Sequence, residues 1–161
     1  MSCVSSAEST SQIKSLELRE TRVRPKLCKQ KKLALTLLAE WRRSTRPTGT
    51  SHQKWDKKVR SEYKDYKHYG KVHNLSYEAY NKYESQLGNT TEQRLTCASL
   101  AIQSAEDAFR EAEARYSFMT SYSHAFPPVG IEGHINAFKT AAEMGLDAID
   151  CFKRMVGAVK S

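Results

Sequence analysis

Apolar residues recur along most of this chain at spacings of three and four, which is the pattern of helices that bury one face. A period of two among β-branched residues, the sign of half-buried strands, is not found in the sequence. The pattern therefore predicts an all-α protein built as a helical bundle.

Proline, glycine and capping residues set the expected boundaries of the helices. Residues 1–12 are Ser-rich and are predicted to be a disordered tail. Pro25 suits the first turn of a helix, so a weak helical segment before it is expected to be separate from the helix that follows. Gly70 and Gly88 are each expected to end a helix. The helices predicted in this way cover 12–24, 25–43, 51–69, 76–87, 89–124 and 131–159.

Two heptad repeats separated by a turn at 127–130 form the clearest pattern in the chain. Heptad helices joined by a short turn predict an antiparallel αα-hairpin, whose apolar seam is expected to form a core and also to join copies of the chain. The seam residues are Leu95, Ile102, Phe109, Tyr116, Ile135, Phe138, Ile149 and Phe152. The chain is thus divided into a tail (1–12), a basic helical region (13–88) and a heptad-patterned hairpin (89–161), and we expect the last two to form one cooperative domain.

The formal net charge of +8 is distributed unevenly. Residues 1–75 hold 18 Lys and Arg against 7 Asp and Glu, whereas residues 76–161 hold 8 against 11. The first part therefore carries +11 and the second −3. A dense set of cations repels itself, so a polyanion is the natural partner of the first part.

The basic residues of the first part segregate from the apolar ones on a helical wheel. Within 25–46 the leucines and Trp41 occupy one arc and the cations the other, and the following helix repeats this arrangement. Such faces are candidates for contacts with phosphates, although a solvated face is the common alternative. The candidate nucleic-acid-binding residues are Lys29, Lys31, Lys32, Arg42, Arg43, Arg46, Lys57, Arg60, Lys64 and Lys67.

Six of the eight tyrosines fall between residues 63 and 83. Interleaved with lysine, they could form a surface on which unpaired bases stack. On the wheel, however, tyrosines and lysines point in opposite directions, which favours tyrosines that belong to the core.

These observations predict a non-enzymatic nucleic-acid-binding protein that contacts the phosphate backbone without reading base sequence, as a homo-oligomer. The usual DNA-reading motifs are missing, which favours RNA over DNA. A packaging, sequestering or silencing-suppressor type of role fits this design, and by analogy of architecture so does a compact viral accessory or nucleocapsid-type protein. The alternative is a helical adaptor for protein–protein interaction whose basic half docks on an acidic protein.

The other motifs that could indicate a function are absent from the sequence or are weak evidence for one. No catalytic motif, phosphate-binding glycine loop or metal-ligand spacing occurs, so neither a cofactor nor a metal is expected. No apolar run is long enough to span a membrane, and no secretory signal is present. A cytoplasmic or nuclear location is predicted, because Arg42-Arg43 and the cluster Lys54–Lys58 resemble a bipartite import pattern.

Overall fold

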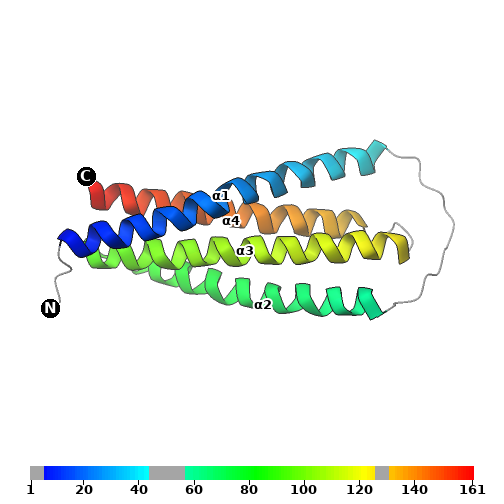
Figure 1. Cartoon of the computed structure of the whole chain (residues 1–161), viewed down its shortest axis with the longest axis horizontal. Coiled ribbons are helices and arrows are strands. Elements are labelled where there is room, and N and C mark those ends of the chain that lie inside the picture. Colours follow the sequence, from blue (N-terminus) through cyan, green and yellow to red (C-terminus); the bar gives the residue numbers. More distant parts are fainter. Residues whose placement is uncertain (1–5, 44–56, 126–130) are drawn as a thin grey trace.

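The computed structural model describes residues 6–43, 57–125 and 131–161. This part of the chain forms four α-helices: α1 (Ser6–Arg43), α2 (Lys57–Ser85), α3 (Thr91–Ala125) and α4 (Ile131–Lys160). Consecutive helices run in opposite directions, so the first residue of α1 and the last residue of α4 lie at the same end of a long bundle (Figure 1). The prediction of an all-α helical bundle is confirmed.

Helix α1 is longer than the sequence predicted. It begins at Ser6, so the described part of the predicted tail is helical, and it continues through Pro25 without interruption. The reason is a buried line of residues three and four apart that runs past the proline on both sides. Val23 and Leu27 are both buried, whereas Pro25 is exposed. Packing on both sides thus offsets the hydrogen bond that proline cannot make, which costs about 3 kcal/mol in a helix interior.

Helix α2 is one helix where the sequence predicted two. Gly70 lies in its interior, and no break occurs before Ser76. Its buried positions repeat every seven residues across the glycine and are Val59, Tyr66, His73 and Tyr80. Such a line stays on one face only if the helix is continuous. The packing of this line outweighs the poor helix propensity of one glycine, which costs about 1 kcal/mol.

The start of α3 follows its capping residues, as predicted. The Gln93 backbone N–H donates to Thr90 Oγ1 (3.1 Å), and the Thr90 N–H donates back to Gln93 Oε1 (3.4 Å). This reciprocal pair is a capping box, and it fixes where the helix begins.

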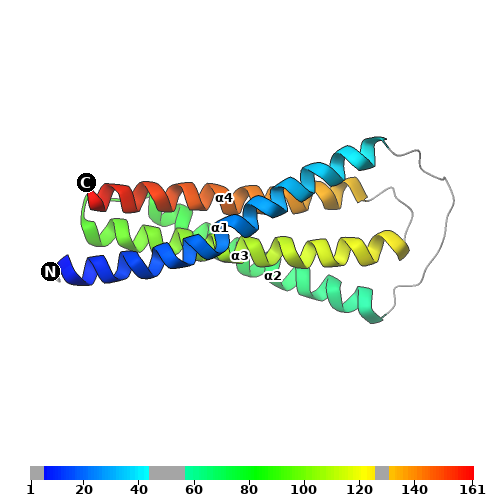
Figure 2. The same ribbon diagram turned by 45° about the horizontal axis from the view of Figure 1, so that its top comes forward.

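Helices α3 and α4 pack along their full lengths as the predicted hairpin, and α1 lies across both of them (Figure 2). Gly145 permits the close approach of α1 to α4. A Cβ atom at this position would lie 2.7 Å from Leu27 Cδ2 and 3.1 Å from Ala108 Cβ. The absence of a side chain at residue 145 thus lets three helices meet at one level of the core.

Helix α2 packs chiefly on α3, and it does so through aromatic rings. Phe118 is 1% exposed, and its ring centroid lies 5.4 Å from that of Tyr63 and 5.1 Å from that of Tyr66. Tyr77 and Tyr80 form a further edge-to-face pair at 5.6 Å. The tyrosines of the described helix therefore belong to the core or its rim, as the wheel indicated.

The seam residues of the hairpin are buried or half-buried within this single chain. Leu95, Ile102 and Ile149 are at most 1% exposed. The heptad pattern is therefore explained by packing inside one bundle, and it no longer argues for a second copy of the chain. The predicted homo-oligomer has no support from the seam.

Candidate nucleic-acid interface

A row of basic residues runs along the face of α2 opposite its buried line. The row consists of Lys57, Arg60, Lys64, Lys67 and Lys71, and all five are exposed. Their spacings of three and four residues place one cation in each helical turn. At 1.5 Å per residue the row covers about 21 Å. We call these five residues the α2 row.

The α2 row lacks acidic partners within the described part of the chain. No carboxylate there lies within 4 Å of Lys57, Arg60, Lys64 or Lys71, and the ammonium of Lys67 lies 5.6 Å from the centroid of the Tyr63 ring. Lys71 was not among the predicted residues, although it continues the same spacing four residues after Lys67. The row therefore presents positive charge that nothing described on the bundle neutralises.

The candidates on α1 are divided by the fold. Lys29 and Lys32 are exposed, whereas Lys31 is half-buried with its Nζ 4.0 Å from Glu143 Oε2 of α4. The other three candidates, Arg42, Arg43 and Arg46, lie outside the described side chains, as does most of the predicted import pattern. The outer face of α1 also exposes Leu18, Leu33 and Leu35. Its cations are thus mixed with apolar groups.

Several other basic residues of the bundle are paired with acidic ones. Arg19 of α1 makes a two-pronged contact with Glu106 of α3, which raises the pKa of the guanidinium. Glu20 is only 8% exposed and forms ion pairs with Arg24 (3.1 Å) and with Lys153 of α4 (3.9 Å). Lys160 lies 2.9 Å from Glu17. Among the described basic side chains, Arg19 and Lys31 of α1 thus lie within 4 Å of a carboxylate on another helix. On α4 the same is true of Lys153, Arg154 and Lys160.

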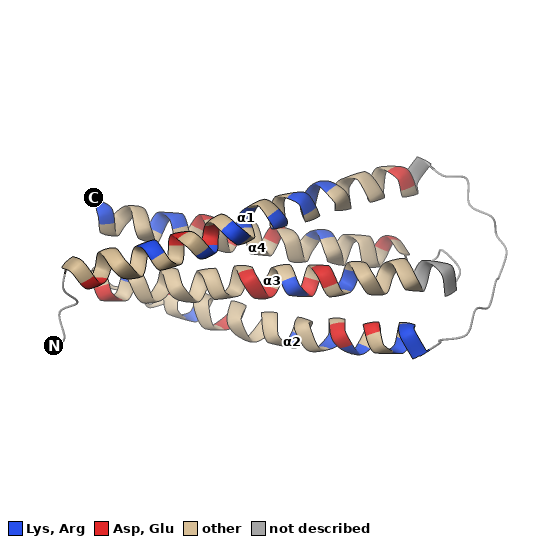
Figure 3. Ribbon diagram, viewed as in Figure 1, with Lys and Arg blue, Asp and Glu red and all other residues tan. Residues whose placement is uncertain are grey.

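The two sets of candidates do not form one surface. The ends of α1 and α2 that meet residues 44–56 lie at opposite edges of the bundle in both views, with α3 and α4 between them (Figures 1 and 2). Basic and acidic positions alternate along the middle of α1, whereas near residue 57 the acidic positions of α2 face α3 and the basic ones face away (Figure 3). A ligand would have to wrap around the bundle to contact both.

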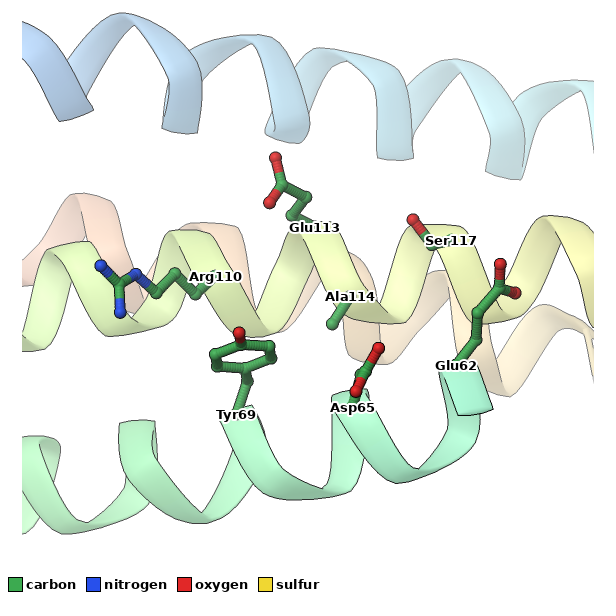
Figure 4. Close-up of a pocket in the computed structure, with 7 residues that line it drawn as sticks. All are labelled: Glu62, Asp65, Tyr69, Arg110, Glu113, Ala114 and Ser117. Atoms are coloured by element: carbon green, nitrogen blue, oxygen red, sulfur yellow. The ribbon is translucent and has the colours of Figure 1, made fainter. Parts of the chain in front are cut away.

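One flank of α2 carries negative charge. A cavity of about 520 Å³ lies there between α2 and α3, lined by Glu62, Asp65, Tyr69, Arg110 and Glu113 among others. Glu62 and Asp65 extend from α2 toward α3, and Arg110 lies near Tyr69 (Figure 4). Three carboxylates against one guanidinium repel a polyanion. This flank of α2 is therefore unfavourable for an anionic ligand.

That other flank holds a cavity of about 440 Å³ between α2, α3 and α4. His73 and Glu111 line it, with His73 Nδ1 2.9 Å from Glu111 Oε1. Arg115 also lines it and lies with its guanidinium carbon 4.0 Å from the centroid of the Tyr66 ring. Arg115 Nη1 is 3.2 Å from His134 Nδ1, and burial together with this cation lowers the pKa of His134. We call this the α2 cavity.

His73 is incompletely paired in its buried position. It is 2% exposed, and its Nε2 atom has no hydrogen-bond partner. A buried polar atom without a partner costs about 1–3 kcal/mol, so such atoms are uncommon in stable cores. His73 therefore contributes one buried polar atom that lacks a hydrogen-bond partner to the wall of the α2 cavity.

The cysteines carry no reactive arrangement that the structure describes. Cys97 and Cys151 are buried, and burial raises the pKa of both thiols. Cys151 donates to Glu84 Oε2 at 3.3 Å. Thiols that resist ionisation are poor nucleophiles. Within residues 6–43, 57–125 and 131–161, no group of three or more His, Cys, Asp or Glu is placed to hold a metal ion.

Comparison of the chain with models of protein families, with curated proteins and with solved structures finds no match. Among the described helices, none has a stretch long and apolar enough to cross a membrane.

Proposed function

We propose that this protein binds the phosphate backbone of a nucleic acid through the α2 row, without reading the base sequence and without catalysing a reaction. The observation that carries the proposal is the row itself, in which cations follow one another at each helical turn and lack acidic neighbours in the described chain. The cations of the row would replace counterions condensed on the phosphates, and the release of those counterions is the main source of affinity in non-specific binding.

The position of the row on α2 supports this function. The buried face of α2 is held by aromatic packing against α3, so the row lies on a rigid helix. Elements of fixed geometry hold a ligand at a lower entropic cost than loops do. The acidic flank next to α3 directs a strand toward the outer face.

The test is the affinity of the full chain for labelled single-stranded RNA and for duplex DNA, measured by fluorescence anisotropy between 50 and 300 mM salt. Contact with five phosphates predicts that log affinity falls with log salt at a slope of about −3.5 for a single strand and about −4.5 for duplex DNA. No binding at low salt contradicts the proposal. Tight binding to polyglutamate but not to nucleic acid would instead identify the acidic-protein adaptor.

A further inference from the structure

The α2 cavity lies where the α2 row ends. Lys67 and Lys71 belong to the row and also line the cavity. Beyond Lys71 the outer face of α2 changes character, because Leu75 is 67% exposed, Glu78 follows in the next turn, and the next Lys or Arg is Lys82. At 1.5 Å per residue this gap covers roughly 16 Å. A strand that follows the row therefore meets its last cations beside the cavity.

The wall of the cavity holds a half-buried arginine that no carboxylate of the described chain approaches within 4 Å. The guanidinium carbon of Arg115 lies 4.0 Å from the centroid of the Tyr66 ring, and Tyr66 lines the cavity too. Nη1 of Arg115 lies 3.2 Å from His134 Nδ1. Glu111, one turn before Arg115, faces His73 instead, with 2.9 Å between Oε1 and Nδ1. A tyrosine ring and an imidazole thus hold the guanidinium in place, and no anion neutralises it there.

The charges of the lining residues favour an anionic ligand. Lys67, Lys71 and Arg115 provide three cations, whereas Glu111 is the one carboxylate among the residues that line the cavity. A charge that is partly removed from water costs free energy unless a group of opposite charge compensates it. A guanidinium also presents several N–H donors in a planar fork that matches the oxygens of a phosphate. A phosphate is therefore the group that this cavity would bind.

The end of a strand offers the phosphate that fits this place best. An internal phosphodiester is joined to a sugar on each side, so the strand would have to bend sharply to bring it into the cavity. A terminal phosphate is joined to one sugar only, and near pH 7 it carries a charge of about −1.5 to −2, more than a phosphodiester does. It can therefore enter the cavity while the adjoining nucleotides remain on the row.

We propose that the α2 cavity binds the terminal phosphate of the nucleic-acid strand, with Arg115 in the wall and Lys67 and Lys71 at the mouth as its ligands. The inference rests on the proposed function, because it needs a strand on the α2 row. It adds a preference for strands that end in a phosphate, and this preference is independent of the bases.

The experiment compares three 12-residue uridine oligomers on the full chain at one salt concentration, each labelled on an internal base. One carries a 5′-phosphate, one a 3′-phosphate, and one has hydroxyls at both ends. We expect a terminal phosphate to raise the affinity about tenfold, the effect of one hydrogen bond to a charged group. The two phosphorylated oligomers show which end enters the cavity. This comparison on the wild type needs no variant, so it tests the inference even where a substitution does not fold.

Substitutions on α3 locate the bound phosphate. The readout is the ratio of the affinities for the phosphorylated and the hydroxyl-ended oligomer, from which a general change in affinity cancels. Arg115→Gln removes the guanidinium and should lower this ratio to about one, whereas Arg115→Lys keeps the charge and should retain part of the gain. Arg110→Gln is the matched control, because it removes the same charge from an exposed residue of α3 on the acidic flank, and it should keep the full ratio.

The outcomes separate the two proposals. Equal affinity of the wild type for all three oligomers, with binding still dependent on the α2 row, overturns this inference and leaves the proposed function standing. A gain that Arg115→Gln retains, or that Arg110→Gln loses to the same extent, places the terminal phosphate elsewhere and also overturns the inference. Absence of binding to any oligomer overturns both proposals. Tighter binding of uridine 5′-monophosphate than of the phosphorylated oligomers identifies a free nucleotide as the ligand and overturns the inference as well.

Discussion

Helices α1 and α2 carry most of the basic residues of this bundle, yet they use them differently. Basic and acidic residues of α1 pair with groups of opposite charge on α3 and α4, as in Arg19 with Glu106 and Lys153 with Glu20. The contacts of α2 with α3 depend on aromatic rings and one His–Glu pair, so its lysines remain on the outside. Net charge alone therefore does not locate an interface, because charge that pairs between helices is unavailable to a ligand.

The largest expected effect is a loss of RNA affinity when basic residues of α2, and not those of α1, are replaced by glutamate. Lys57→Glu/Arg60→Glu/Lys64→Glu on α2 should lower RNA affinity about 100-fold or more near 100 mM salt and make the salt slope less steep by about 2, since three phosphate contacts are lost. The matched set Arg22→Glu/Lys29→Glu/Lys32→Glu on α1 changes the net charge equally and should cost less than about tenfold through the long-range field alone. Fluorescence anisotropy provides the measurement. Equal losses of RNA affinity from the two sets would contradict the assignment of the interface to α2.

The second prediction concerns the packing of α1. Gly145→Ala places a methyl group against Leu27 and Ala108 and should destabilise the fold by about 1–3 kcal/mol, the usual cost of overpacking a core. Gly157→Ala on the same helix is the control, because its Cβ would meet nothing within 4 Å, and it should stabilise by about 0.5–1 kcal/mol. Urea denaturation measures both, and a neutral Gly145→Ala would mean that α1 approaches α4 less closely.

A smaller effect is expected from the ion pair between α1 and α3. Arg19→Met removes the contact with Glu106, and both side chains are about 30% exposed, so solvent screening limits the loss of stability to about 0.5–1 kcal/mol. RNA affinity should be unchanged, because Arg19 is occupied in stabilising the bundle. A loss of RNA binding without a loss of stability would assign Arg19 to the interface instead.

The smallest expected effect is a dependence of stability on pH. It arises from His134 of α4, which contacts Arg115 in the wall of the α2 cavity. The pKa of His134 is lowered from 6.5 in the folded state, so the unfolded chain takes up the proton first. The stability that His134 contributes is complete above about pH 6.5 and is lost as the pH falls through the lowered folded value. The wild type should therefore lose more stability between pH 7.5 and 5 than His134→Phe, which keeps a ring against Phe118.

Urea denaturation at each pH provides the measurement, and the other titrating groups are common to both proteins. Curves that run parallel over this pH range would show that His134 titrates in the folded protein as it does in the unfolded chain.

The accuracy of the sequence analysis depended on whether a feature was local. The α3–α4 hairpin, the Thr90 cap and the core position of the tyrosines were predicted correctly, because period and capping chemistry are encoded within a few residues. Pro25 and Gly70 were wrongly predicted as boundaries. Local propensity favours a break at each of them, and the buried lines that pass through them are stabilised by distant helices.

The candidate interface was predicted in part, for the same reason. The wheel located Lys57, Arg60, Lys64 and Lys67 on an exposed face, since opposite faces of one helix follow from spacing alone. It could not show that Lys31 approaches Glu143, because those residues are 112 positions apart. The α2 cavity was missed as well, since it is assembled from three helices and no sequence motif connects His73 with Glu111 or Arg115.

The sequence by itself determined that this protein is helical, where its apolar seams lie and that its excess of positive charge precedes residue 76. Only the tertiary structure decided which of those charges remain available and which polar groups meet in the core. The physical reason is range: helix periodicity is set by neighbours within one or two turns, whereas ion pairing and desolvation are set by whichever helix packs alongside.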